Sequence, residues 1–508
     1  MLEDKYNFKK INKNRSAGVL LHISSLPNPY GFGSLGEEAF DFVRKLKRAG
    51  QSWWQVLPIG PTGFGDSPYQ SFSSFAGNPY MINLDYLKDN GLLQEEDLKL
   101  VMEQYDNGKV DYGKLYEERF TTLQKAYENF DISSLDFESF CRENSFWLND
   151  YALFMTLKDE FDKKPWQMWE REYKYRDEKV LEDFEKKNFH KVNFYRFLQY
   201  EFFNQWDRLR DFAHENGIKL IGDLPIYVAE DSSDCWSNPE LFTLNEDLKP
   251  IWVGGCPPDG FSEDGQLWGN PCYDWKAHEE TDFKWWIERF KWLFSIFDCI
   301  RIDHFRGFES YWRIPAEDET ARNGSWIDGP KMKLFKALKD QLGELPIIAE
   351  DLGYMTKEVY EFRKETGFPG MKILLFAFLP DASSDYLPHN IEKDYVVYGG
   401  THDSDTIVGW SLEHDPREVE FAKSYLNLTQ EEGFNWGMIR GGMTSVAEMS
   451  IFQMQDILGL DNDARMNYPG KASGNWTWRM KADGFNDDLV ERLRKYTAMS
   501  GRLNRDSN

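Results

Sequence analysis

The stretch Arg301-Ile-Asp303-His-Phe-Arg306 joins the end of an apolar run to a carboxylate, and this pattern decides the expected fold. An apolar run of this length that ends on an acid is typical of a buried parallel strand reaching an active-site rim. Taken singly, each acid is equally well explained as a helix cap or a solvated loop residue. Four such acids in succession favour the interpretation that they stand at an active-site rim. The other three stretches are Pro346-Ile-Ile-Ala-Glu350-Asp351, Gly400-Thr-His402-Asp403-Ser-Asp405 and Ile221-Gly-Asp223.

Charge and aromatic content narrow the substrate class. The chain has 508 residues and a net charge of −26, without a dense Lys/Arg patch, which argues against nucleic acid and against a highly acidic substrate. It is rich in Trp (19), Tyr (25) and Phe (38), and some of these rings lie in Gly/Pro-rich stretches. Flat rings with polar edges suit a sugar, which has apolar faces and hydroxyl rims. Several carboxylates at one rim indicate acid, base or nucleophile chemistry on such a neutral substrate.

Cysteine usage and hydropathy point to the cytoplasm. The sequence contains no apolar run of about 18 residues, and its polar N-terminus lacks the apolar stretch of a signal peptide. Its few cysteines have no CxxC spacing, which fits reduced thiols in a cytosolic protein. They are Cys141, Cys235, Cys256, Cys272 and Cys299.

Strand and helix patterns alternate along most of the chain. About eight strands alternating with helices predict a (β/α)₈ TIM barrel, with residues 1–508 forming a single catalytic barrel. The expected strands cover residues 17–23, 52–58, 218–224, 299–303, 346–350, 371–378, 395–400 and 451–454. The expected helices cover residues 37–49, 194–216, 283–297, 331–342, 357–366 and 416–426.

Two stretches interrupt the alternation. Residues 85–191 are charged, mix acidic and basic side chains and contain little Gly or Pro, which predicts an inserted helical subdomain. Residues 228–276 are rich in Gly, Pro, Trp and Asp, which predicts an inserted, loop-like region that covers the substrate.

The sequence argues against a dinucleotide site and against a metal site. The motif Gly31-Phe-Gly33-Ser-Leu-Gly36 matches GxGxxG, but the next expected strand does not end in the acidic residue that a dinucleotide fold requires. His304 and His402, the only histidines beside candidate catalytic acids, could hold a cation together with several aspartates, but a carboxylate trio beside Arg301 explains the same residues without a metal. The sequence therefore predicts neither a cofactor nor a metal.

Nine segments taken together make the sequence recognisable. From Arg15 to about Arg479 it resembles the amylomaltases, the bacterial disproportionating 4-α-glucanotransferases, which are relatives of the α-amylase superfamily. The segments are AGVLLHISSLPNPYGFGSLG (17–36), WWQVLPIGPTGFGDSPYQSFSSFAGNPY (53–80), GDLPIYVAEDSSDCW (222–236), PPDGFSEDGQLWGNPCYDW (257–275), RIDHFRGF (301–308), IIAEDLG (347–353), FPGMK (368–372), GTHDSDT (400–406) and RMNYPGKASGNWTWR (465–479).

The resemblance implies a role for each acid of the trio. Asp303 matches the family's catalytic nucleophile, Glu350 its general acid/base and Asp403 the third carboxylate, which holds sugar hydroxyls and stabilises the transition state. It implies transfer of α-1,4-glucan segments from a donor to the 4-hydroxyl of an acceptor glucan or of glucose, through a covalent glycosyl-aspartate. The implied glucans are maltooligosaccharides, amylose, glycogen or starch.

The resemblance also implies a set of substrate-binding residues. Tyr69 matches the aromatic platform under the sugar, and residues 257–268 match a flexible loop that closes over bound glucan. The implied binding residues are Tyr69, Asp223, Arg301, His402, Phe261, Trp268 and Asn475. Two departures stand out: Phe64 replaces a tyrosine that serves a secondary glucan site in some relatives, and Gly260 replaces a bulkier loop residue.

Simple electrostatics agrees with these roles. Arg301 lies two residues before Asp303, on the same strand face, so its charge favours the ionised acid that a nucleophile must be. Glu350 follows Ile-Ile-Ala, and apolar burial near other acids favours the protonated form of a proton donor. The alternatives are a retaining α-glucan hydrolase and a non-catalytic starch-binding protein. The sequence leaves the oligomeric state and the donor size open.

Overall fold

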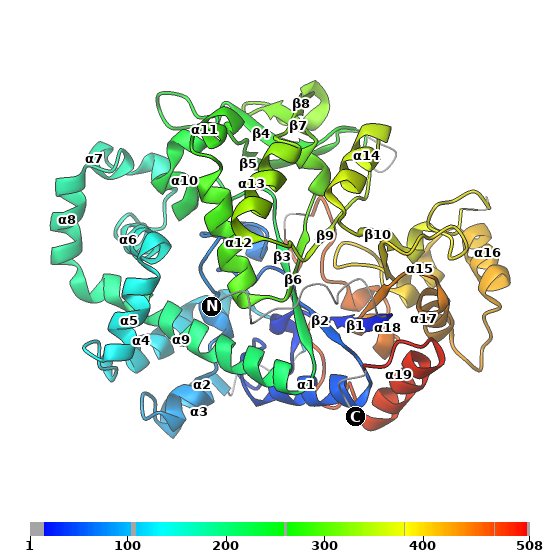
Figure 1. Cartoon of the computed structure of the whole chain (residues 1–508). Coiled ribbons are helices and arrows are strands. Elements are labelled where there is room, and N and C mark those ends of the chain that lie inside the picture. The colour runs from blue at the N-terminus through cyan, green and yellow to red at the C-terminus, as the bar shows by residue number, and fades with distance from the viewer. Residues whose placement is uncertain (1–14, 103–107, 259–261, 380–381, 472, 505–508) are drawn as a thin grey trace.

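Eight parallel strands form the centre of the molecule (Figure 1). The computed structural model describes residues 15–102, 108–258, 262–379, 382–471 and 473–504. The barrel strands are β1 (Ser16–Leu20), β2 (Trp53–Gln55), β3 (Lys219–Leu224), β6 (Cys299–Ile302), β9 (Ile347–Ala349), β10 (Gly370–Ile373), β11 (Tyr395–Tyr398) and β12 (Met449–Gln453). All eight expected strands are present, and the (β/α)₈ prediction is confirmed.

The strands follow one another around the barrel in the order β10-β11-β12-β1-β2-β3-β6-β9. The N–H of Ala349, at the end of β9, donates to the carbonyl of Pro369, just before β10, at 2.9 Å, and this bond links the two ends of the order. Both faces of the strands are covered, as the burial of almost every strand residue shows, so continuous apolar runs rather than alternating ones encode them.

Helices surround the strands, and apolar stripes hold them there. In α12, Trp286 and Phe290 have no exposed surface, so this face of the helix packs into the core. The surrounding helices are α1 (Glu37–Arg48), α9 (Phe189–Glu215), α12 (Lys284–Ile296), α13 (Met332–Leu342), α14 (Lys357–Thr366), α15 (Ile407–Glu413), α16 (Pro416–Leu426), α17 (Phe434–Thr444), α18 (Met454–Leu458) and α19 (Asp487–Met499). Among the described residues, no helix has the length and apolarity that crossing a bilayer requires.

The first interrupting stretch is built of helices, which form a group to one side of the strands in Figure 1. They are α2 (Leu84–Asp89), α3 (Glu95–Met102), α4 (Tyr112–Glu128), α5 (Leu135–Glu143), α6 (Ser145–Glu160), α7 (Arg171–Lys174) and α8 (Glu178–Lys187). The long helix α9 follows them and packs against α6. That residues 85–191 form a separate subdomain stays a prediction.

The second interrupting stretch differs from the expected loop, because it contains two strands as well as α10 (Ser233–Ser237) and the start of α11 (Trp275–Glu280). β4 (Trp252–Cys256) and β5 (Gln266–Pro271) join β7 (Ser310–Pro315) and β8 (Ser325–Asp328) in an antiparallel sheet of order β5-β4-β7-β8.

Close backbone packing explains why this sheet reads as a loop. A Cβ on Gly255 would lie 2.1 Å from the carbonyl oxygen of Gln266, so only glycine fits there. On its other side β4 pairs with β7, which is distant in the sequence, and the composition around β4 gives no indication of that pairing.

The glycines of the rejected GxGxxG motif also pack against protein. A Cβ on Gly33 would lie 1.9 Å from the carbonyl oxygen of Ile23, and one on Gly36 would lie 2.1 Å from the Nδ2 atom of Asn83. These contacts account for the glycines without a bound phosphate.

Candidate active site

Three neighbouring strands, β3, β6 and β9, place acids at one edge of the barrel. Asp223 lies near the end of β3, while Asp303 directly follows β6 and Glu350 directly follows β9. The N–H of Asp303 donates to the carbonyl of Leu224 at 2.9 Å, and that of Glu350 donates to the carbonyl of Ile302 at 3.1 Å. The strand pairing itself therefore sets the relative positions of the acids, as expected for a barrel whose site lies at the carboxyl ends of its strands.

Arg301 connects two of these acids. Its Nη1 donates to both carboxylate oxygens of Asp223, at 2.9 and 2.7 Å, and its Nη2 donates to Oδ1 of Asp303 at 2.8 Å. Desolvation alone would lower the pKa of the buried guanidinium, but the two carboxylates raise it well above its ordinary value. The Asp223 side chain is fully buried, whereas that of Asp303 is 30% exposed, so Asp303 is the one of the two whose carboxylate is accessible from outside.

Glu350 is held differently, by backbone N–H groups. Its Oε2 accepts from the N–H of His304 at 2.7 Å, and its Oε1 accepts from the N–H of Leu352 at 2.9 Å. His304 has a φ of 51°, a left-handed conformation that is uncommon for residues other than glycine and that aims its N–H at the carboxyl group. Among the described residues, no lysine or arginine forms an ion pair with Glu350.

Burial raises the pKa of Glu350 to about 8. Desolvation is the largest cause, and the nearby charge of Asp303 adds to it, while Arg301 and the two backbone hydrogen bonds act in the opposite direction. The carboxyl group therefore holds a proton at neutral pH, which is the state that a proton donor needs.

Asp403, after β11, is the most exposed of the trio, with 45% of its side chain accessible. Its Oδ2 lies 3.3 Å from Nε2 of His402, and its Oδ1 accepts from Nδ2 of Asn467 at 2.6 Å. Desolvation raises the pKa of Asp403, but the charge and hydrogen bond of His402, together with Asn467, outweigh it and lower the pKa below its usual range. Asp403 is therefore an ionised acceptor open to solvent.

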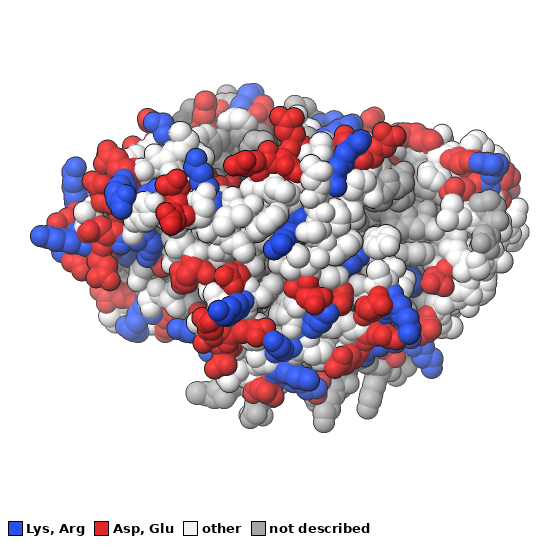
Figure 2. Space-filling model, turned by 90° about the horizontal axis from the view of Figure 1, so that it is seen from above, with Lys and Arg blue, Asp and Glu red and all other residues white. Residues whose placement is uncertain are grey.

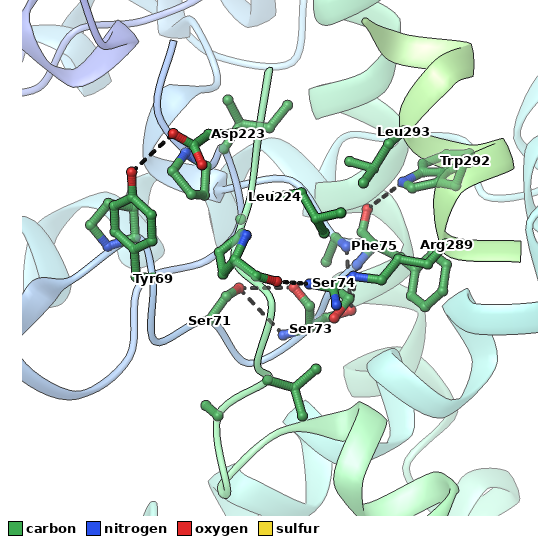
Figure 3. A pocket seen from close by; sticks show the side chains of 18 of the residues that line it. Tyr69, Ser71, Ser73, Ser74, Phe75, Asp223, Leu224, Arg289, Trp292 and Leu293 are labelled. Atoms are coloured by element: carbon green, nitrogen blue, oxygen red, sulfur yellow. Dashed lines mark hydrogen bonds between the residues drawn. The ribbon is translucent and has the colours of Figure 1, made fainter. Parts of the chain in front are cut away.

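Tyr69 lies beside Asp223 and His402. Its hydroxyl donates to Oδ2 of Asp223 at 3.1 Å, the contact drawn in Figure 3. Its ring stacks on the imidazole of His402, with centroids 5.0 Å apart and an interplanar angle of 19°. The ring of Trp476 lies 5.8 Å from each of these two rings. These contacts fix an aromatic wall next to the carboxylates.

A small cavity of about 50 Å³ lies behind Tyr69, between the segment that carries Ser71–Ser74 and helix α12 (Figure 3). Tyr69 and Asp223 line it, but Asp303, Glu350 and Asp403 do not. Its size suits one or two water molecules rather than a sugar ring. The cavity therefore backs the site and is not the place where a glucan would be cut.

The remaining predicted binding residues have different positions. Trp268, on β5, meets the ring of His304 edge-on with centroids 4.8 Å apart, so it lies beside the acids. Asn475 uses both ends of its amide within its own loop: Oδ1 accepts from Tyr468 N–H at 3.0 Å and Nδ2 donates to the Lys471 carbonyl at 2.8 Å. Phe261 and Gly260 lie outside the described residues, and the roles of all these residues in substrate binding stay predictions.

The sequence reasoning missed several residues of the site, and most of them come from one segment, RMNYPGKASGNWTWR (465–479). Asn467 holds the carboxylate of Asp403, and Nη2 of Arg465 donates to the backbone carbonyl of Asp403 at 2.6 Å. Trp476 completes the wall around Tyr69. Polar and aromatic residues in a Gly-rich stretch could have indicated that this segment belongs to the site. The sequence around them does not indicate which acid they contact. Among the described residues, no group of three or more His, Cys, Asp or Glu side chains is arranged to hold a metal ion.

Comparisons with known proteins agree with this geometry. Residues 21–484 match the family described as 4-alpha-glucanotransferase. The chain is 50% identical to a 4-alpha-glucanotransferase of Clostridium butyricum over 95% of this chain and 100% of that protein, and 45% identical to one of Thermus thermophilus over 96% and 99%. Its structure is similar to that of an amylomaltase from Streptococcus agalactiae in complex with acarbose (TM-score 0.94, 39% identity, 96% of this chain and 100% of that one). The chain therefore belongs to the 4-alpha-glucanotransferase family and is a transglycosylase of that type.

Proposed function

We propose that this 4-alpha-glucanotransferase works by a retaining double displacement in which Asp303 is the nucleophile and Glu350 the general acid and base. The observation that carries the proposal is the contrast between the two acids. Asp303 receives a charged hydrogen bond from Arg301, whereas Glu350 is held by backbone N–H groups and its pKa is raised to about 8. An ionised carboxylate next to a protonated one is the pair that retaining cleavage requires.

The first displacement cleaves the glucan. A carboxylate oxygen of Asp303 attacks the anomeric carbon, the bond from that carbon to the glycosidic oxygen breaks, and the proton of Glu350 moves to the departing oxygen. In the second displacement the 4-hydroxyl of an acceptor attacks the same carbon, its proton passes to Glu350, and the ester bond to Asp303 breaks. The product keeps the α configuration, and both acids return to their starting states.

The surrounding side chains hold the sugar through this cycle. Asp403, ionised and exposed, accepts hydrogen bonds from sugar hydroxyls, and His402 stands next to it. Tyr69 offers a flat ring to the apolar face of the sugar, and its own hydroxyl is anchored on Asp223. Arg301 keeps Asp303 in place for attack.

The substrates proposed are uncharged α-1,4-glucans, with maltooligosaccharides, amylose, glycogen or starch as donors and glucose or a glucan as acceptor, in the cytoplasm. The similar amylomaltase of Streptococcus agalactiae was solved with acarbose. Figure 2 shows a wide area of uncharged residues running between mixed acidic and basic groups, a surface that suits such substrates. Residues 228–276, which include β4 and β5, are the proposed cover over bound glucan.

Incubating the protein with maltotriose alone tests the proposal. A ladder of longer glucans together with glucose is the expected result, because every glycosyl-enzyme passes its segment to another maltotriose or to glucose. Glucose and maltose alone would show that water is the acceptor and the protein acts as a hydrolase. Unchanged maltotriose would show binding without catalysis.

A further inference from the structure

Tyr354 lies in the loop between β9 and α14, four residues beyond Glu350, and 63% of it is exposed. Its ring stacks against that of Trp326 on β8, with centroids 6.2 Å apart and an interplanar angle of 20°. Large aromatic side chains are normally buried, so an exposed tyrosine ring that lies near-parallel to a half-buried tryptophan calls for an explanation. Neither residue takes part in the mechanism above.

Arg306 holds this pair of rings in place. Its guanidinium carbon lies 3.8 Å from the centroid of the Trp326 ring, its Nη1 donates to the backbone carbonyl of Tyr354, and its Nη2 donates to Oγ of Ser310 at 3.2 Å. Arg306 itself is only 3% exposed. The rings are therefore ordered before any ligand arrives, which lowers the entropy cost of binding one.

The segments that hold the ring pair are the ones that carry the catalytic acids. Arg306 follows Asp303 by three residues, and the N–H of the intervening Phe305 donates to the carbonyl of Glu350 at 3.2 Å. Tyr69 and His402, the proposed partners of the cleaved sugar, come instead from the segments after β2 and β11. Figure 1 shows β7 and β8 at the top of the view, near α14 and the loop that leads to it from β9.

We propose that Tyr354 and Trp326 form a further glucan-binding subsite for the acceptor chain, one or more glucosyl units away from the 4-hydroxyl that attacks. This rests on the proposed role of Glu350, which is the acid/base that meets the acceptor. A glucan fits the surface because its sugar units have flat apolar faces edged with hydroxyls.

The polar groups around the rings match those hydroxyls. Asp328 lies two residues after Trp326 on β8 and thus on the same strand face, with 82% of its side chain exposed. Lys331 pairs with it at 3.0 Å and with Glu309 at 3.2 Å. Each of these groups can exchange hydrogen bonds with a neutral sugar. An uncharged glucan is therefore the ligand that fits both the aromatic rings and the polar groups around them.

The test uses α-maltosyl fluoride as donor, because its leaving group occupies no acceptor subsite, and compares glucose with maltotetraose as acceptor. In Tyr354→Ala the apparent KM for maltotetraose should rise about three- to tenfold, the loss expected for one aromatic contact. The KM for glucose should stay unchanged, since glucose is too short to reach the rings. Tyr354→Phe, which keeps the ring, should behave as the wild type does.

The control is Tyr116→Ala, which removes a similarly exposed tyrosine (47%) from α4, outside the barrel, and should change neither KM. An unchanged KM for maltotetraose in Tyr354→Ala would overturn the proposal, as would equal losses with both acceptors or a Phe variant as weak as the Ala variant. If the wild type transfers to neither acceptor, the proposed function itself has failed, which is a separate result.

Discussion

Asp303 and Glu350 follow two neighbouring strands, β6 and β9, yet the protein surrounds their carboxyl groups with opposite kinds of partner. Asp303 contacts the guanidinium of Arg301 at 2.8 Å. Glu350 contacts only backbone N–H groups among its described hydrogen bonds, and burial raises its pKa to about 8. The comparison teaches that position along the barrel brings the acids together, while their immediate surroundings differ: a guanidinium at Asp303, and burial with backbone N–H groups at Glu350.

The guanidinium of Arg301 is shared between Asp303 and a second acid. Arg301 forms its other ion pair with the fully buried Asp223, which occupies Nη1 and leaves Nη2 for Asp303. A buried charge needs such partners, because removing one leaves the other without compensation. We therefore expect Asp223 to act on the chemistry through Arg301 rather than by touching the substrate.

The largest effect is expected from Asp303→Asn. Asn has the same shape but cannot form the glycosyl ester, so transfer should fall by more than about a thousandfold. Binding of maltoheptaose, measured calorimetrically, should change little. Residual transfer above a few per cent in a preparation free of wild-type enzyme would contradict the assignment of the nucleophile.

The next largest effect is expected from Glu350→Gln, which cannot protonate the leaving sugar. Transfer from maltotriose should fall by about a hundred- to ten-thousandfold. A glucosyl fluoride donor, whose leaving group needs no proton, should restore the first displacement and let a glycosyl adduct accumulate on Asp303. Peptide mass spectrometry checks the position, and an adduct on another residue, or none, would show that the two roles are paired wrongly.

A smaller effect is expected from Arg301→Lys, which keeps the charge but loses the fork that bridges Asp223 and Asp303. The loss of one charged hydrogen bond, about 1.5–3 kcal/mol, should lower kcat/KM by roughly ten- to a hundredfold. Arg417→Lys is the matched control, because Arg417 bridges Asp415 at the surface with 81% of its side chain exposed. Equal kcat/KM in wild type and Arg301→Lys would show that the contact between Arg301 and Asp303 does not matter for the difference between the two acids.

The smallest effect is a pH dependence. The pKa of Glu350 is raised, so the group is protonated below about pH 8 and loses its proton above it. With maltotriose, kcat/KM should therefore fall about tenfold per pH unit on the alkaline side, with a midpoint near pH 8. In Glu350→Gln with the fluoride donor, the release of fluoride should lack this alkaline decline. If the alkaline decline persists in the variant, a titrating group other than Glu350 causes it.

Much of the barrel was predictable, because strands buried on both faces leave continuous apolar runs in the sequence. Ile347–Ala349 is an example, and Glu350 directly follows it, whereas β11 ends at Tyr398, some residues before Asp403. The expected strand at residues 371–378 is shorter in the structure, since β10 ends at Ile373 and a 3₁₀ turn, Leu374–Phe376, follows it. Apolar content alone does not separate a buried strand from a buried turn.

The contacts between side chains of distant segments were not predictable. The stacking of Tyr69 on His402 joins residues 333 positions apart, and Asn467 reaches Asp403 across 64 positions. In the sheet of β4, β5, β7 and β8, the pairing of β4 with β7 was missed for the same reason, since these two strands are not neighbours in the sequence. Tyr354 and Trp326 likewise come together only because the loop after β9 packs against β8.

The amino-acid sequence alone determined which runs are buried strands, about where each strand ends, and that an acid stands at several of those ends. These are local properties, written in hydrophobicity and residue type. The sequence also placed Arg301 beside Asp303, but only the tertiary structure decided that Asp223 shares that guanidinium and that backbone N–H groups hold Glu350. Protonation depends on the charges and solvent within a few ångströms, and strand pairing, which joins residues far apart in the chain, sets those surroundings.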